Sequence, residues 1–535
     1  MTTENFPTRV LIGFTGHIEI ENKDEIRSRI SAAISQIHDQ VDDDGEFAHV
    51  PAILTALAEG SDRLAADAIS EQENGELHAV LPLQPDEYKT TFNSQDAKNE
   101  LDQYLEEALT ATVEPEREER PGVYLDVGKS IVDTCDVLLA VWDGGSSGGE
   151  GGTADIVEYA RRHKTPLVWI NPTQAGGDPI LENFEDFSLS QADEILDFND
   201  LKASEERLSE ESEERLSDYS DTGHFDTEEL EDANRVYEIF EKIFQSHFPV
   251  FWKANRYSLK NQNRYKYATI LTYSLAAIAV GVISIQTLFF PDHPEFVLLE
   301  SLAMIVIVGI VLLGSRREWH ANWLKYRTLS EKVRSRWYIA LSSRCTSSLV
   351  GPSPVHDRQF TSRWISDILI EAWKRTDCES KNTDIKVETT KAFLEKHWIE
   401  NQIDYHETNS VSSQRMNRAL SNSGLLVFLI TLIASFLHAT ELAGHDYTSY
   451  ILLISFFLPS VGGAFGAIRM SQDFETEALR SERILRQLEG LNYQLDYIND
   501  PDDLVDWGHE VEKILEIEHH NWRNIHEGKP LEPVS

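Results

Sequence analysis

The chain has 535 residues, which is long enough for two or three domains with cores of their own. Its 91 acidic and 48 basic residues give a formal charge of −43, so the surface repels nucleic-acid phosphates and no DNA or RNA partner is expected. Acidic residues are spread over the polar stretches, which is typical of proteins that stay solvated in concentrated salt. This pattern predicts a halophilic source.

The three cysteines, Cys135, Cys345 and Cys378, are far apart in the sequence. Because no pair of them has the spacing of a zinc site or of a disulfide framework, no metal and no cofactor is expected. Residues 1–8 contain no apolar signal-peptide region, so export is not expected either.

From Arg9 to about residue 172, short apolar runs alternate with helical stretches, which predicts an α/β domain with a parallel, Rossmann-like sheet. The predicted helices are 22–41, 61–69, a stretch near 95–110, and 153–163. The predicted strands are 10–14, 53–58, 77–81, 136–142 and 166–170.

Three of these strands are followed by turns that contain glycine, at 13–17, 59–63 and 143–153. Ligands of open α/β sheets bind at the carboxyl ends of the strands, so the three turns would lie on one edge of the sheet. Glycines let backbone amides approach an oxyanion closely. The candidate ligand-binding residues are Gly13, Thr15, Gly16, His17, Gly60, Asp62, Arg63, Asp143, Gly144, Gly151, Gly152, Thr153, Asp155 and Glu158.

The side chains of these turns allow functional and purely structural interpretations. Arg63 is suited to pair with phosphate, and Thr153 to cap the helix at 153–163. His17 fits a capping or ligand-contacting role better than that of a catalytic base. Asp155 and Glu158 would bind ribose hydroxyls, or would stabilise the helix N-terminus without any ligand.

Four later segments are apolar over about the 20 residues that a helix needs to cross a membrane. They form two hairpins, the first from 268–290 and 296–314, the second from 424–442 and 450–468. Core helices of a soluble domain are rarely apolar all round over such lengths, and two matching hairpins argue further against them. The sequence therefore predicts an all-α membrane region with four transmembrane helices.

The distribution of basic residues predicts the orientation of these helices. Neither hairpin loop, 291–295 or 443–449, contains lysine or arginine, whereas basic residues flank the opposite ends of both hairpins. The positive-inside rule then places both termini and the segment 315–423 in the cytoplasm of a multi-pass cell-membrane protein. The flanking basic residues are Arg256, Lys260, Arg264, Lys266, Arg316, Arg317, Lys325, Arg327, Arg415, Arg418, Arg469, Arg480 and Arg483.

The two hairpins look like a loose internal duplication, because a charged helical stretch follows each of them. These stretches, 326–334 and 479–486, are either solvated helices with internal ion pairs or stalks that pack against each other or other subunits. Gly462 and Gly466 form a G-x-x-x-G pattern that permits close helix packing, so a homo-oligomer is expected. Glu300, near the outer end of the second span, either snorkels outward or lines a wet path.

At the three glycine turns, the N-terminal domain resembles the SLOG superfamily of Rossmann-like domains, and the short-looped hairpins with their charged helices look like SLATT membrane effector modules. The resemblance implies a nucleotide or ADP-ribose-like ligand, a lipid-bilayer partner and a role in antiviral defence. The related LOG hydrolases carry two adjacent glutamates after the G-x-G-T loop. Here Thr153 is followed by Ala154, Asp155 and Ile156, which favours sensing over hydrolysis.

These observations predict a ligand-sensing membrane effector. The alternatives are a membrane-anchored nucleotide or N-glycoside hydrolase that uses Asp155 or Glu158, and a scaffold in which the hairpins are anchors only. The predicted division is a SLOG-like domain (1–175), an acidic linker (176–235), the first hairpin with its helices (236–345), a helical cytoplasmic segment (346–415), and the second hairpin with C-terminal helices (416–535).

Overall fold

The computed structural model describes residues 5–41, 49–113, 120–146, 149, 151–174, 176–185, 187–189, 191–202, 204–220, 230–345, 362–376, 385–442 and 444–528. The chain divides into two compact units, and each draws on three separate stretches of sequence. The α/β unit comprises Met1–Glu214, Glu241–Pro249 and Thr346–Thr383, and the helical unit comprises Arg215–Phe240, Val250–Cys345 and Asp384–Ser535. The consecutive ranges predicted from the sequence do not show this interleaving.

The α/β unit is built on a seven-stranded sheet with the order β4-β3-β2-β1-β5-β6-β7, in which only β7 runs antiparallel to its neighbour. This confirms the predicted Rossmann-like α/β fold. In the centre, Ile12 of β1 is paired with Ile53 of β2 and with Val137 of β5. The strands are β1 (Thr8–Gly16), β2 (His49–Thr55), β3 (Glu76–Leu81), β4 (Thr110–Val113), β5 (Val137–Val141), β6 (Leu167–Ile170) and β7 (Ile180–Glu182).

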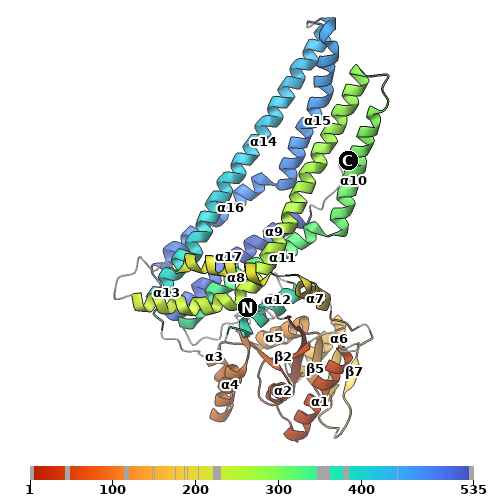
Figure 1. Ribbon diagram of the computed structural model, residues 1–535. Helices are drawn as coiled ribbons and strands as arrows, with labels where there is room; N and C mark the ends of the chain where they lie inside the picture. The colour runs from red at the N-terminus through yellow and green to blue at the C-terminus, as the bar shows by residue number, and fades with distance from the viewer. Residues whose placement is uncertain are drawn as a thin grey trace. The chain divides into compact units, whose positions relative to one another are not determined.

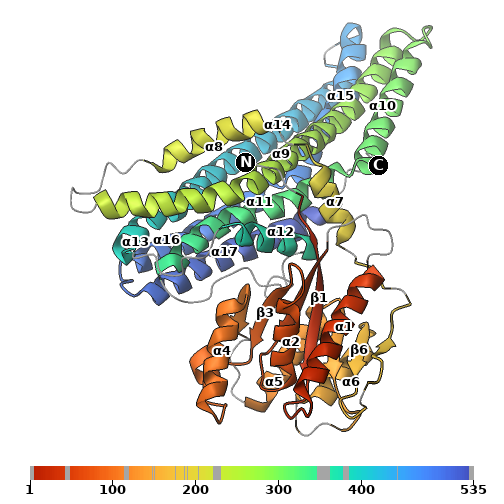
Figure 2. The same cartoon turned by 60° about the horizontal axis from the view of Figure 1, so that its bottom comes forward.

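Helices cover both faces of this sheet (Figure 2). Alternate residues of β1 point to opposite faces, so Val10, Ile12 and Phe14 join the core under α1, α2 and α4, and Leu11 joins the core under α5. The helix α6 covers the same face as α5. The helices of this unit are α1 (Lys23–Val41), α2 (Ser61–Ser70), α3 (Pro85–Lys89), α4 (Gln95–Glu107), α5 (Arg120–Thr134), α6 (Thr153–His163), α7 (Ala192–Asp200) and α12 (Arg363–Lys374), while α8 (Glu205–Tyr219) begins in this unit and ends in the helical one.

The helix α12 lies at the amino ends of the strands, although it follows the first hairpin in the sequence. Arg9, fully buried at the start of β1, donates to the Asp367 carbonyl at 2.8 Å and to Glu371 at 2.9 Å, and it also pairs with Glu76 at the start of β3. Arg363 donates to Asp136, just before β5, at 2.7 Å. Burial alone would raise the pKa of Glu76, but Arg9 beside it outweighs this effect and holds the pKa well below its ordinary value.

The helical unit contains four helices that are long and apolar enough to cross a membrane. Figure 1 shows them as two long hairpins, α9 with α10 and α14 with α15. The hairpins meet where a Cβ on Gly281 of α9 would lie 2.8 Å from the ring of Phe457 of α15, and Phe289 packs on Tyr450 with ring centroids 5.1 Å apart. The helices of this unit are α9 (Leu230–Phe289), α10 (Phe296–Arg316), α11 (Trp319–Ser342), α13 (Val387–Leu394), α14 (Glu400–Thr440), α15 (Thr448–Gln472), α16 (Phe474–Leu495) and α17 (Pro501–Glu527).

The charged helix after each hairpin packs within the helical unit. In α11, Arg327 pairs with Glu331 at 2.5 Å, and Lys332 pairs with Glu516 of α17. In α16, Arg480 pairs with Glu518 of α17 at 2.8 Å. The helix α17 therefore holds both charged stretches that the sequence presents as copies of each other.

Candidate functional site

The topological switch point of the sheet lies between β1 and β5. The chain leaves β1 toward α1 on one face and leaves β5 toward α6 on the other, although the two strands are hydrogen-bonded neighbours. The turns after these strands consequently diverge at the carboxyl edge, where open α/β sheets bind their ligands. The first and third predicted turns follow these two strands.

Hydrogen bonds connect the first turn to both of the others. The backbone N–H of His17 donates to the Val141 carbonyl at 3.2 Å. The carbonyl of His17 accepts from Ser61, the first residue of α2, through its backbone N–H at 3.1 Å and its hydroxyl at 2.8 Å. The structure thus brings together the three turns that the sequence placed on one edge.

His17 and Asp143 face each other across the switch point. Nε2 of His17 lies 3.2 Å from Oδ1 of Asp143 and accepts from the Asp143 backbone N–H, also at 3.2 Å. A hydrogen bond from the Gly145 backbone N–H and the neighbouring imidazole hold the pKa of Asp143 below its ordinary value. The side chains are 34% and 44% exposed, so both are accessible to a ligand while remaining fixed by hydrogen bonds.

The glycines of the turns serve packing and backbone geometry. A Cβ on Gly16 would overlap the Ser61 hydroxyl, and one on Gly60, whose φ is +92°, would overlap the Ile18 carbonyl. Gly13 is different, since its Cβ would meet the side chains of Ile131 and Cys135, so this glycine serves the packing of α5 on the sheet. Gly144 has a φ of +86° and no atom within 4 Å of a Cβ, so open space surrounds it. Thr15, the remaining residue of the first turn, is half-buried at the end of β1.

Arg63 is buried in the α/β unit and bound to α4. Its guanidinium donates to Glu100 at 2.5 Å and to the Ala97 carbonyl at 2.9 Å, and it lies over the ring of Phe92 at 5.0 Å. A phosphate would have to compete with all three contacts for this side chain. The sequence carried no sign of these partners, because they lie more than 25 residues away, on α4 and in the segment that precedes it.

Asp62 is buried beside Arg63 and accepts a hydrogen bond from the Thr55 hydroxyl at 2.9 Å. Burial raises the pKa of Asp62 to about 7, because the Thr55 bond offsets only part of the cost of desolvating the charged form. This carboxyl can therefore hold or release a proton near neutral pH. Thr55, at the end of β2, is a polar residue of the site that was not predicted, because it lies outside the glycine turns.

The predicted residues of the third turn and of α6 contact neighbouring groups of the same turn and helix. The N-cap of α6 is Gly152, one residue before the predicted Thr153, which is instead the first residue of the helix. Asp155 accepts from the Gly151 backbone N–H at 3.0 Å. Glu158 pairs with Arg162 one turn later at 2.7 Å on an exposed surface. Asp155 thus contacts the N-terminus of α6, whereas Glu158 forms an exposed ion pair within the helix.

Aromatic residues behind the third turn fix its position. Trp142, which follows β5, donates to the Gly145 carbonyl at 3.0 Å and packs on Trp169 with centroids 5.3 Å apart. The guanidinium of Arg161 lies 5.3 Å from the centroid of the Trp142 ring. The sequence predicts only that Trp142 lies in a strand, and its hydrogen bond to the turn was not predicted.

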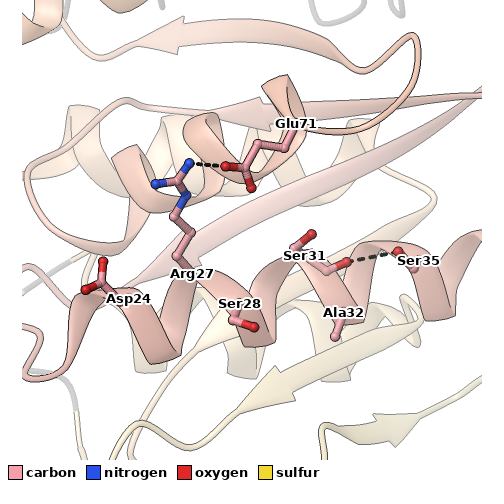
Figure 3. A pocket seen from close by; sticks show the side chains of 7 residues that line it. All are labelled: Asp24, Arg27, Ser28, Ser31, Ala32, Ser35 and Glu71. Atoms are coloured by element: carbon pink, nitrogen blue, oxygen red, sulfur yellow. Dashed lines mark hydrogen bonds and ion pairs between the residues drawn. The ribbon is translucent and has the colours of Figure 1, made fainter.

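A separate hollow of about 480 Å³ lies along α1 (Figure 3) and contains none of the predicted residues. Its most prominent contact is the ion pair between Arg27 and Glu71, and Ser35 donates to the Ser31 carbonyl one turn back at 3.2 Å. The walls are open and polar, and the one arginine is already paired. The hollow is therefore a weaker candidate for a ligand-binding site than the carboxyl edge of the sheet.

No family model matches the chain, and no curated protein matches its sequence. Among the residues that the structure describes, no three histidine, cysteine or carboxylate side chains are arranged to hold a metal ion.

Proposed function

We propose that the protein is a membrane-bound sensor and effector. Its α/β unit binds a nucleotide or ADP-ribose-like ligand, and its hairpins respond by altering or permeabilising the bilayer as a homo-oligomer. The resemblance of the sequence to SLOG and SLATT modules supports this proposal and extends it to antiviral defence.

Ligand binding by the α/β unit is proposed because hydrogen bonds hold the three glycine turns together at the switch point. Backbone N–H groups at the start of α6 favour an anionic group through their direction and through the helix dipole. His17 and Asp143 follow the neighbouring strands β1 and β5 at the same edge of the sheet, where a carboxylate and an imidazole can hydrogen-bond ribose hydroxyls. A phosphorylated ribose combines both kinds of group.

Replacing Gly152 with tryptophan tests the site. The bulky side chain at the N-cap would fill the space that a phosphate or ribose needs, so binding of mononucleotides and ADP-ribose to the full-length protein should be lost. Isothermal titration calorimetry with these compounds in high salt measures the affinity. Gly490→Trp is the control, since a Cβ at this helical glycine of the other unit meets no atom within 4 Å. Unchanged affinity in Gly152→Trp would place the site elsewhere.

We expect binding without turnover. Asp155 is bound to the Gly151 amide and Glu158 to Arg162, so neither carboxylate is positioned as a free general acid or base. Chromatography of nucleoside monophosphates after long incubation should show no free base. Repeated turnover that disappears in Asp155→Asn would support the hydrolase alternative instead.

The effector half is tested in liposomes that contain the full-length protein and a trapped dye. The ligand identified by titration should release the dye, and Gly152→Trp should prevent the release. A ligand can shift the membrane half only by its differential affinity for two states, by a factor of ten for about each 1.4 kcal/mol. Liposomes that stay sealed while the ligand binds would favour the scaffold alternative.

A further inference from the structure

An acidic residue in the left-handed backbone conformation follows the second span of each hairpin. Glu318, between α10 and α11, has a φ of 48° and a ψ of 39°, and Asp473, between α15 and α16, has a φ of 52° and a ψ of 36°. Neither is a glycine, so each conformation carries a steric cost from its Cβ. The same outlier at the same place in two hairpins indicates a shared requirement.

Asp473 is both the C-cap of α15 and the N-cap of α16. The Asp473 N–H donates to the Arg469 carbonyl in α15 at 3.1 Å, and the Asp473 carbonyl accepts from Glu477 in α16 at 3.0 Å. At the other bend two adjacent residues share these roles, since Arg317 is the C-cap of α10 and Glu318 is the N-cap of α11. The Glu318 carbonyl accepts from Asn322 at 2.8 Å. A change of φ and ψ at these cap residues would therefore redirect the span without breaking either helix.

The helices on the two sides of each bend differ in how firmly they are held. In the part of the chain that the structure describes, α10 buries only Ile307 and Gly314, and α15 buries only Ile451. On the other side of the bend, Trp323 of α11 packs in a cluster with Tyr265 and Trp522.

Further contacts hold the two charged helices. Thr328 of α11 is 2.8 Å from His519 of α17, and Arg480 of α16 pairs with Glu518 of the same helix. Asn409 of α14 donates to Glu477 and Ser481 of α16 at 2.9 and 2.8 Å. Each bend thus joins a span with few buried residues to a helix held by packing and ion pairs, although α15 also lies along α14, where Arg469 donates to Asn417 at 2.6 Å.

We propose that Glu318 and Asp473 are paired hinges at which α10 and α15 tilt relative to the fixed helices α11 and α16. Backbone outliers of this kind persist where the surrounding structure holds them, and they cluster at switch regions. The inference depends on the membrane-effector half of the proposed function and not on the identity of the ligand. The bent form is the resting state, and opening follows from release of the left-handed conformation.

Substitutions at the hinges should shift the balance between bent and redirected spans in opposite directions. Glycine removes the Cβ and should favour the bent form by about fivefold per site, which corresponds to about 1 kcal/mol. Valine is β-branched and tolerates a positive φ least, so it should raise the redirected population. Asparagine tolerates the left-handed region and should behave like the natural residue.

Electron–electron distance measurements between spin labels on unnatural amino acids report the tilt directly, with the native cysteines left in place. One pair joins Leu302 of α10 to Ile517 of α17, and the other joins Phe456 of α15 to Tyr493 of α16, all of which are exposed. In lipid nanodiscs, the glycine variants should narrow the distance distributions and the valine variants should add a second distance.

Glu441 is the matched control, since it has a φ of 51° but lies at the other end of its hairpin, after α14. Glu441→Gly and Glu441→Val should leave both distance distributions unchanged. The hinge proposal is overturned if the variants at Glu318 and Asp473 give the same distributions as these controls.

A second measurement separates this proposal from the proposed function. In liposomes of phosphatidylcholine and phosphatidylglycerol without any added ligand, the double valine variant should leak a trapped dye faster than the natural protein. If the spin-label distances change but the liposomes do not leak, the hinge proposal stands and the proposed permeabilising function is wrong. Unchanged distances would reject the hinges whatever the liposomes do.

Discussion

Asp62 was predicted from the sequence as a ligand-binding residue of the second glycine turn. In the structure its side chain is buried and bound to Thr55. Its neighbour Arg63, predicted to pair with phosphate, is bound to Glu100. The glycine turns could be predicted because turn geometry is local. The partners of these two side chains could not, because one depends on the packing of α4 and the other on how the chain folds back onto the end of β2.

The raised pKa of Asp62 makes stability depend on pH. Because the folded protein holds this proton up to about pH 7, against an ordinary value of 3.8, the contribution to the free energy of unfolding is complete below about pH 4 and is lost as the pH rises through 7. The loss is at most about 4 kcal/mol. In detergent, the melting temperature of the full-length Asp62→Asn variant should therefore change less between pH 4 and pH 8 than that of the natural protein.

The matched control for this pH experiment is Asp86→Asn, since the Asp86 carboxylate is almost fully exposed. This control should retain the pH dependence of the natural protein. If the melting temperature of Asp62→Asn changed with pH as steeply as that of the natural protein, Asp62 would not be the source of the pH dependence.

At the scale of elements, the sequence predicted best those segments with a regular apolar period. Helix α6 has the predicted bounds, and β3, β5 and β6 lie within a residue or two of theirs. The short strands β4 and β7 and the helices α3, α7 and α8 were not predicted, since they are too short or too acidic to show a period. The place of α12 could not be read from its sequence either, because its partners Arg9, Glu76 and Asp136 are more than 200 residues away.

The ion pair between Arg363 and Asp136 should be required for docking α12 on the sheet. Arg363→Glu leaves two carboxylates facing each other at a largely buried site, which should lower the free energy of unfolding by about 3 kcal/mol. The reversed pair, Arg363→Glu with Asp136→Arg, should recover part of this loss. Recovery would be incomplete because Asp136 also accepts from the Leu11 backbone N–H at 2.8 Å.

The same charge reversal on an exposed pair gives the control for the docking experiment. Arg162→Glu acts on the pair with Glu158 and should cost less than about 1 kcal/mol. Denaturant unfolding of the full-length protein in detergent compares the two reversals. Equal losses at both sites would mean that α12 is not held by its ion pair.

At the scale of the whole molecule, the four membrane helices could be predicted because a span needs only length and apolar composition. Three of the four have only 6% of their apolar stretch buried within the protein, which fits helices whose apolar surface faces lipid. The interleaving of the two units could not be predicted, since it depends on contacts between distant segments. Orientation stays a prediction from the basic residues.

We expect both termini and the segment 315–423 to lie in the cytoplasm. Single cysteines introduced at Asp292 or His445 should react with an impermeant thiol reagent added outside intact cells, and a cysteine at the exposed residue Thr408 should react only after permeabilisation. The absence of lysine and arginine from both hairpin loops is the reason for this expectation. Reaction of residue 408 from outside, with 292 and 445 protected, would invert the topology.

The docking of α12 has a consequence for biosynthesis. Arg9 and Glu76 acquire their last partners only when the ribosome has passed Lys374, by which time both spans of the first hairpin have been made. Translation at roughly 5–20 residues per second leaves their charges without α12 for on the order of tens of seconds. The sheet is thus completed after membrane targeting has begun, and a nascent chain that stalls between the hairpins presents chaperones and proteases with an unfinished domain already tethered to the bilayer.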